Sequence, residues 1–234
     1  MEKIKEEVPE KLRIAVLLSF ISGYINAFTY NNAGELFAGA QTGNVIFMAL
    51  HFAKGNLEKA VEFLIPIISF MIGQIFIYCF RNFFQRRGHK GYIHSSLLML
   101  FIMIMLIVLL PFFDYHFIVV TLAFFAAIQS DTFQRLRGFS YATIMMTGNV
   151  KNAPRFLIEG LVQRDRELLV RGFLLFLIIF SFMLGVGIST YFTQFVKKSA
   201  LVPLILPLSY INYVLFKEEH NVIDVVKSKI RKIK

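Results

Sequence analysis

Two long stretches of the sequence, residues 95–113 and 172–196, carry no charged side chain. A helix that crosses a membrane needs about 20 mostly apolar residues, because the hydrocarbon layer is roughly 30 Å thick. A soluble domain of this length could not bury several such segments around one core. In addition, 56% of the residues are hydrophobic and the mean hydropathy is +0.62, whereas soluble domains are roughly 45–50% apolar. The chain is therefore predicted to be an all-α integral membrane protein.

The apolar pattern predicts six membrane-spanning helices and two shorter helices. The six spans cover residues 12–31, 60–81, 95–113, 117–134, 172–194 and 199–216. The first short helix, residues 43–53, has too few apolar residues to span a bilayer. The second, residues 142–158, carries Lys151, Arg155 and Glu159 on one helix face. A charged stripe that faces lipid is costly, so this helix is expected at an interface, in a protein groove, or partly re-entrant.

The distribution of basic residues supports the six-span count. With six spans, 21 of the 25 Lys and Arg residues fall on the side that holds the N-terminus, and four fall on the other side. Because basic residues concentrate on the cytoplasmic side of membrane proteins, both termini are expected to be cytoplasmic. The lipid bilayer is thus the expected partner. Nucleic acid is not, although the net charge is +10, and a homo-oligomer stays open.

The sequence contains an internal repeat. The triplet Thr42-Gly43-Asn44 recurs as Thr147-Gly148-Asn149, and Ser69-Phe70-Met71-Ile72-Gly73 recurs as Ser181-Phe182-Met183-Leu184-Gly185. Each half contains three spans, so the second half must enter the membrane from the opposite side. This predicts a 3+3 inverted repeat with two short Thr-Gly-Asn half-helices, an arrangement common in transporters. The alternative is that duplication only built a stable bundle.

This organisation divides the chain into four parts. They are a cytoplasmic N-terminal segment (1–11), a first three-span repeat (12–113), a second three-span repeat (117–216) and a C-terminal tail (217–234). The tail combines apolar residues at helical spacing with several Lys and Arg residues, which is typical of an amphipathic helix on an anionic membrane surface.

The residues that mark the repeat also carry a family resemblance. Gly23-Tyr24-Ile25-Asn26-Ala27, followed by the two Thr-Gly-Asn triplets, is similar to the YoaK-type family of uncharacterised bacterial inner-membrane proteins. The resemblance covers roughly residues 12–216, and it implies a six-span membrane protein without naming a substrate. The chain departs from the family pattern at Asn26, where an Asp is common, and at Ala127-Ile128-Gln129-Ser130-Asp131, where Gly-x-Gln-Asn-Ala is common.

Polar residues inside the predicted spans are the candidate site. Ionisable groups in a span are costly and often mark a cavity or an ion path. Asp131 therefore indicates a cation or proton site, with a pKa raised by burial or a charge held by Arg135 one turn later; the alternative is an Asp–Arg pair near the interface. At an offset of 105 residues Asp131 corresponds to Asn26, whereas an offset of 104 pairs Asn26 with Ser130.

The triplets favour helix starts, because Thr or Asn can cap free amides and Gly permits an unusual turn. If both short helices re-enter the membrane, their N-termini point into the protein and suit an anionic or polar solute. If they do not, the triplets only cap interfacial helices.

The leading interpretation is a secondary transporter or channel for a small polar or ionic solute. The predicted path between the two repeats is lined by Asn26, Thr42, Gly43, Asn44, Gln74, Gln129, Asp131, Thr147, Gly148 and Asn149. The alternative is a membrane scaffold or accessory subunit without transport activity. No catalytic pair, no metal-ligand spacing and no cofactor motif is found in the sequence, so neither an enzyme nor a bound metal or cofactor is expected.

Overall fold

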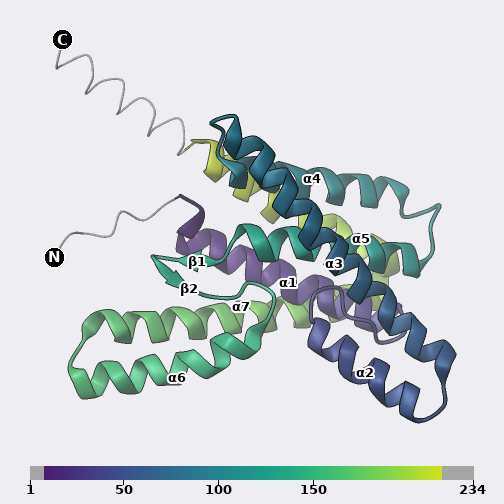
Figure 1. The fold of residues 1–234 in the computed structure, drawn as a ribbon, viewed down its shortest axis with the longest axis horizontal. Helices are drawn as coiled ribbons and strands as arrows, with labels where there is room; N and C mark the ends of the chain where they lie inside the picture. The colour runs from purple at the N-terminus through teal and green to yellow at the C-terminus, as the bar shows by residue number, and fades with distance from the viewer. Residues whose placement is uncertain (1–7, 218–234) are drawn as a thin grey trace.

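The computed structural model describes residues 8–217, and helices make up most of it (Figure 1). Its elements are a 3-10 helix Val8–Glu10, α1 Leu12–Asn32, α2 Gln41–Ala53, α3 Leu57–Arg86, α4 Gly91–Leu109, α5 Tyr115–Thr132, strands β1 Arg135–Leu136 and β2 Phe139–Ser140, α6 Met146–Gln163, α7 Arg166–Val196, a 3-10 helix Lys197–Leu204 and a last helix over residues 205–217. The all-α prediction is confirmed, apart from the antiparallel hairpin of two-residue strands. The predicted tail (217–234) and most of the N-terminal segment lie outside the described residues.

Several helices have the dimensions of membrane spans. Within residues 8–217, four helical runs are long and apolar enough to cross a bilayer: Leu12–Asn32, Leu57–Arg86, Gly91–Leu109 and the continuous run Arg166–Lys217. The last run is 52 residues long and contains both α7 and the helix over residues 205–217. These helices are those of a multi-pass membrane protein.

Several predicted boundaries differ from those in the structure by a few residues, and three of the differences have a local reason. The span predicted at 95–113 is α4, which ends at Leu109, because Pro111 has no amide hydrogen with which to continue the helical hydrogen bonds. The helix predicted at 142–158 begins at Met146 instead, because Asn149 holds the backbone of the preceding segment in a loop. The span predicted at 199–216 opens as a 3-10 helix that contains Pro203 and becomes α-helical at residue 205.

Two pairs of long helices form the frame of the molecule. α1 runs beside α7 and α3 runs beside α5, and both pairs are parallel. In the first pair the Ser181 Oγ donates to the Val16 carbonyl at 2.7 Å. In the second pair the Ser69 Oγ donates to the Val120 carbonyl at 2.6 Å. The same kind of hydrogen bond thus joins both pairs.

Glycines bring the paired backbones into direct contact. A Cβ added at Gly185 in α7 would lie 2.1 Å from the Phe20 carbonyl oxygen in α1. A Cβ added at Gly73 in α3 would lie 2.6 Å from the Ala127 Cβ in α5 and 3.2 Å from the Phe124 carbonyl oxygen. Small residues at such positions are the usual means of close helix approach in membranes.

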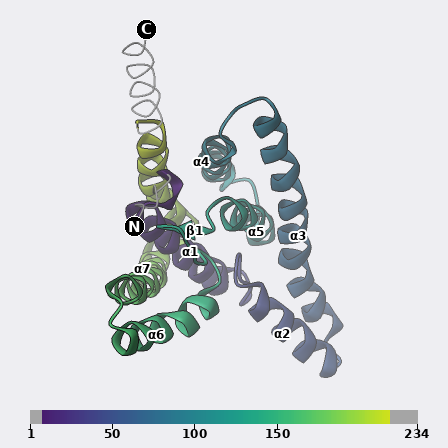
Figure 2. The same ribbon diagram turned by 60° about the vertical axis from the view of Figure 1, so that its left-hand side comes forward.

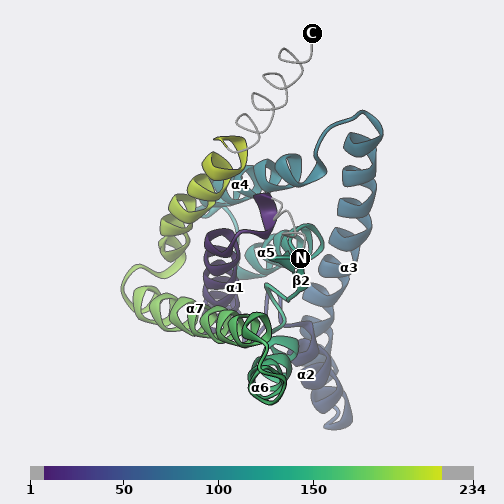
Figure 3. The same ribbon diagram turned by 90° about the vertical axis from the view of Figure 1, so that its left-hand side faces the viewer.

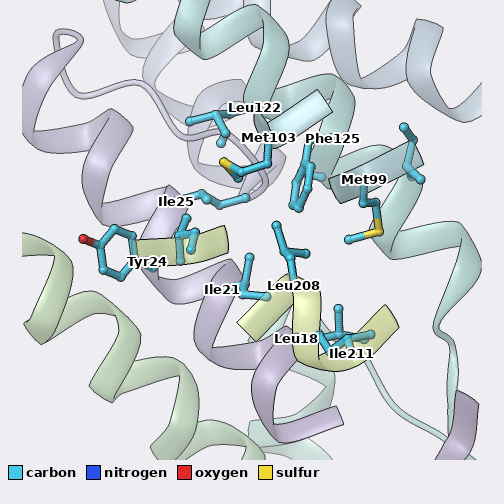
Figure 4. Close-up of a cluster of buried hydrophobic side chains, with 14 of the residues drawn as sticks. Leu18, Ile21, Tyr24, Ile25, Met99, Met103, Leu122, Phe125, Leu208 and Ile211 are labelled. Carbon is cyan, nitrogen blue, oxygen red and sulfur yellow. The ribbon is translucent and has the colours of Figure 1, made fainter. Parts of the chain in front are cut away.

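The main apolar core lies where α1, α4, α5 and the helix over residues 205–217 meet (Figure 4). Leu18 and Ile21 of α1, Met99 of α4, Phe125 of α5 and Leu208 all lie in this cluster. On the α1 side of the cluster, the Tyr24 hydroxyl donates to the Ala200 carbonyl at 2.5 Å. The 3-10 helix Lys197–Leu204 is thereby joined to the core.

The two short helices lie on the outside of the frame. α2 packs on α3 and α6 packs on α7 (Figures 2 and 3). In Figure 1 the two helices start near the middle of the molecule and run in opposite directions, α2 to the right and α6 to the left. The turns α3–α4 and α6–α7 lie toward the left of that view, and the turns α2–α3 and α4–α5 lie at its right end.

Candidate functional site

The asparagine of each Thr-Gly-Asn triplet fixes the loop that precedes its own helix. The Asn44 Oδ1 accepts from the Phe37 amide at 2.9 Å, and its Nδ2 donates to the Phe37 carbonyl at 2.8 Å. The Asn149 side chain binds the Ala142 amide at 3.1 Å and the Ala142 carbonyl at 2.7 Å in the same way. Both asparagines are buried. Their amide groups are used within the protein and hold two loops, which we name the first loop (residues 33–40) and the second loop (residues 141–145).

The threonines do not cap these helices. α2 begins at Gln41 and α6 at Met146, so Thr42 and Thr147 lie in the first helical turn and their side chains are exposed. The N-cap residues are Ala40 and Met145, and neither provides a side-chain capping hydrogen bond. The capping role predicted for the triplets is therefore wrong: each helix starts one residue before its threonine.

The two triplet glycines have different surroundings. Gly43 lies against the Phe37 ring, where an added Cβ would come within 2.8 Å of ring carbons. Gly148 is exposed and has no neighbouring atom within 4 Å of such a Cβ. The start of α6 is thus more open than the start of α2.

The first and second loops meet at the centre of the molecule. A Cβ added at Gly39 would lie 2.5 Å from the Ile144 Cγ2, and 3.4 Å from both the Ala126 Cβ and the Asn26 Nδ2. Gly39 lies two residues before the start of α2, and Ile144 lies two residues before the start of α6. The starts of both short helices therefore converge on one place, from which the helices diverge (Figures 1 and 2).

Asn26 closes the first loop. Its Oδ1 accepts from the amides of Gly39 at 2.9 Å and Ala40 at 3.0 Å, while its Nδ2 donates to the Ser22 carbonyl at 2.8 Å. Asn26 is 3% exposed. The two amides that point away from the start of α2 are therefore satisfied by one side-chain oxygen.

The second loop has a cavity beside it. The cavity has a volume of about 180 Å³ and is lined by Ser130, Gln134, Ser140, Tyr141, Ala142, Thr143, Ile144 and Met145. The hydroxyls of Tyr141 and Thr143 are buried and have no hydrogen-bond partner among the described residues. Within residues 8–217, no side chain accepts from the amides of Ile144 or Met145. This polar cavity has hydrogen-bonding capacity that the protein leaves unused.

The two predicted glutamines link helices across the bundle. The Gln129 Nε2 donates to the Leu18 carbonyl at 3.0 Å and to the Ser22 Oγ at 2.7 Å, and its Oε1 is buried without a partner. The Gln74 Nε2 donates to the Ala127 carbonyl at 3.2 Å. Both side chains join the long helices, and neither lines the cavity of the second loop.

Asp131 forms an ion pair with Arg81 of α3. The Arg81 guanidinium lies 2.6 Å from the Asp131 Oδ2 and also donates to the Asp131 backbone carbonyl at 2.8 Å. The predicted pairing with Arg135 is wrong, because α5 ends at Thr132 and Arg135 lies in the hairpin. The pair borders a second cavity of about 250 Å³, lined by Pro9, Glu10, Arg81, Tyr92, Asp131, Thr132, Phe133, Gln134 and Arg135. Gln134 lines both cavities, which are therefore neighbours.

The predicted residues thus separate into three groups. Asn26, Asn44 and Asn149 hold the converging loops; Gln74, Gln129 and Asp131 join long helices; and the threonines and glycines form the starts of α2 and α6. The residues that line the second-loop cavity were missed, except that Ser130 was considered as the counterpart of Asn26. A comparison of the residues before each triplet would have pointed to them. Within residues 8–217, no cluster of three or more His, Cys, Asp or Glu side chains is arranged to hold a metal ion.

A family described as "Protein of unknown function (DUF1275)" matches residues 14–213 of the chain. This match is consistent with the resemblance seen in the sequence. No curated protein and no solved structure matches the chain. Since the matched region covers most of the sequence, the chain belongs to the DUF1275 family.

Proposed function

We propose that this protein is a secondary transporter or channel that moves a small polar or ionic solute across the inner membrane, along a path between two inverted three-span halves. The observation that carries the proposal is the convergence of the two loops and two short-helix starts beside a half-open cavity that is partly lined by polar side chains. In transporters built from inverted repeats, sites lie where the halves meet, and helix starts are directed at the solute. Two residues of the second loop that line this cavity, Tyr141 and Thr143, carry buried hydroxyls with no partner among the described residues.

Matched contacts support the inverted repeat. The Ser69–Val120 hydrogen bond between α3 and α5 has its counterpart in Ser181–Val16 between α7 and α1. α1 is equivalent to α5, and α3 to α7, so each half contributes one helix to each pair. Both matched contacts place Val16 opposite Val120, an offset of 104, and this register pairs Asn26 with Ser130.

The arrangement of the turns supports the six-span topology. The turns α3–α4 and α6–α7 lie toward one end of the molecule (Figure 1) and carry Arg87, Lys90 and Arg164. At the other end lie Lys54 of the α2–α3 turn, and Lys197 and Lys198, of which Lys198 binds carbonyls of the α4–α5 turn. The first end also has Arg86 and Arg166 at the adjoining helix ends and so holds more Lys and Arg residues. Cytoplasmic loops are richer in Lys and Arg, which supports cytoplasmic termini. With this orientation both short helices are re-entrant, because each returns to the side from which its loop entered.

Transport in proteoliposomes tests the proposal. Purified protein is reconstituted, and gradients of small neutral solutes, anions, cations and protons are imposed one at a time while flux is followed by light scattering or an entrapped dye. Protein-dependent flux of at least one class is expected, compared with liposomes that lack the protein. The absence of flux for every solute class and for protons would refute transport.

Asp131→Asn tests whether a proton takes part. The substitution keeps the size of the side chain but removes its titration, so the pH dependence of flux should change if protons are coupled to the solute. An unchanged pH profile would assign Asp131 to the Arg81 contact alone.

The second candidate is a membrane scaffold or accessory subunit. It is favoured by the two triplet asparagines, whose amides bind their own loops and leave nothing for a solute. The two functions differ in what Asn149→Ala does. A transporter should lose flux while it remains folded, whereas a scaffold should show no flux before or after the substitution and should be recovered in complex with a partner.

A further inference from the structure

The first and second loops are built alike but differ in the side-chain oxygens that accept from their amides. In each, a triplet asparagine binds the peptide seven residues earlier, Phe37 or Ala142. In the first loop the Thr29 Oγ1 accepts from the Ala38 amide at 3.0 Å, and the Asn26 oxygen accepts from the amides of Gly39 and Ala40. The amides at the same distance from the start of α6 are those of Ile144 and Met145. The position opposite them holds Ser130, whose side chain is too short to act as Asn26 does.

The cavity beside the second loop lies where that missing acceptor would be. Ser130, Ile144 and Met145 all line it. Its other polar residues supply hydroxyl and amide donors: Tyr141, Thr143, Ser140 and Gln134. Tyr141 and Thr143 are at least nine-tenths buried, and their hydroxyls have no partner in the described part of the chain.

The charge around this cavity favours a negative ligand. Among residues 8–217, no carboxylate lines it. Of the acids that border the neighbouring cavity, Asp131 is paired with Arg81, and the Glu10 Oε2 accepts from the Gly138 amide at 2.7 Å. α6 is 18 residues long and starts without a side-chain cap. Such a helix start carries a partial positive charge that stabilises an anion.

We propose that the cavity beside the second loop binds one small anion, which accepts from the second-loop amides as the Asn26 oxygen accepts in the first loop. The idea that this anion lies on a transport path rests on the proposed function, whereas binding of the anion does not require transport. The ligand class is a halide or an oxyanion of similar size. Tyr141 and Thr143 donate to the same anion.

The test measures anion-dependent stability of the full-length protein in detergent. Thermal unfolding is followed by far-UV circular dichroism while sodium bromide replaces sodium gluconate at constant ionic strength. A ligand that binds only the folded state raises stability with ligand concentration. A saturable rise in melting temperature is expected with bromide. A linear change without saturation would be a general salt effect and would overturn the proposal.

Two variants locate the effect. Ser130→Asn should supply the missing acceptor and abolish the bromide response. Tyr141→Phe removes a hydroxyl that has no protein partner, so the protein should fold, while a lost hydrogen bond to an anion should weaken bromide binding roughly tenfold. Ser189→Ala is the matched control, because the Ser189 Oγ is also buried and unpartnered but lies outside the cavity; its bromide response should equal that of the wild type.

Each outcome has one consequence. A wild-type bromide response in Tyr141→Phe would place the ion elsewhere and overturn the proposal, even if Ser130→Asn failed to fold. Equal stabilisation by acetamide, a neutral acceptor, would overturn the anion class. Bromide binding without flux of any solute would leave this inference standing and refute the transport function. Flux without bromide binding would overturn this inference and leave the transport function standing.

Discussion

Gly185→Ala should separate the most closely packed pair of helices in the protein. The added Cβ would lie 2.1 Å from the Phe20 carbonyl oxygen and 2.9 Å from the Tyr24 amide nitrogen. Both atoms belong to the backbone of α1, so no side-chain rotation can relieve the contact. Real Cβ atoms stay beyond 3.0 Å, so α1 and α7 must move apart by about 1 Å. Overpacking costs about 1–3 kcal/mol, and a rigid backbone neighbour places this variant near 3 kcal/mol.

Gly187→Ala is the matched control. It lies in the same helix two residues later, and an added Cβ there meets no atom within 4 Å. Since alanine is favoured over glycine inside a helix by about 0.5–1 kcal/mol, this variant should be as stable as the wild type or slightly more stable. Gly73→Ala should fall between the two, because its closest contact is a methyl carbon at 2.6 Å.

The assay is denaturant or thermal unfolding in detergent, followed by far-UV circular dichroism because the chain contains no Trp. The expected order of stability is Gly187→Ala, then Gly73→Ala, then Gly185→Ala. If Gly185→Ala and Gly187→Ala unfold at the same denaturant concentration or temperature, the close α1–α7 approach is wrong. The register that pairs Asn26 with Ser130 would then be wrong too.

Three further predictions concern the loops, the ion pair and the turn before α5. Asn149→Ala removes two side-chain hydrogen bonds to the part-buried peptide groups of Ala142 and should cost about 0.5–1.5 kcal/mol for each bond in the same unfolding assay; wild-type stability would contradict the role of Asn149 in the second loop. Asp131→Asn should destabilise less than Arg81→Ala, because Arg81 keeps its bond to the Asp131 backbone carbonyl, and the reverse order in melting temperature would contradict this. The hydrogen bond from the Phe117 amide is the main cause that holds the pKa of Asp114 below its ordinary value of 3.8; desolvation opposes it, and the charges of His116 and Lys198 lower the pKa further. The Asp114 carboxylate therefore contributes to stability above pH 3.8, and this contribution is lost as the pH falls through the lower pKa of the folded state. The melting temperature of Asp114→Ala should approach that of the wild type at acid pH. A difference in melting temperature that stays constant with pH would contradict this prediction.

The parts of the fold that could be predicted from the sequence are those set by local pattern. Runs of apolar residues identified the long helices, and the repeated triplets marked the starts of α2 and α6 to within a few residues. The second short helix was started too early because a clamp between Asn149 and Ala142 spans seven residues, and no periodicity reports such a bond.

Contacts between distant residues explain most of what was missed at the site. Arg135 is close to Asp131 in sequence, yet the partner is Arg81, 50 residues away, because α3 runs parallel to α5. The second-loop cavity also lies where a side-chain acceptor is missing, because the Ser130 side chain is shorter than that of Asn26. A sequence offset uncertain by one residue could not tell whether Asn26 corresponds to Ser130 or to Asp131.

Packing and ligand binding place different demands on the two halves. Where backbones touch, both halves carry the same residue: Ser69 and Ser181 donate across the helix pairs, and Gly73 and Gly185 admit the neighbouring backbone. Any larger residue at those glycines would force the pairs apart. At the inward-facing amides of the loops such identity is not required, because an amide N–H can donate to a side-chain oxygen, to a water or to an anion. The difference between Asn26 and Ser130 is therefore where two similarly packed halves become distinct, and function is expected at such a difference rather than in the shared frame.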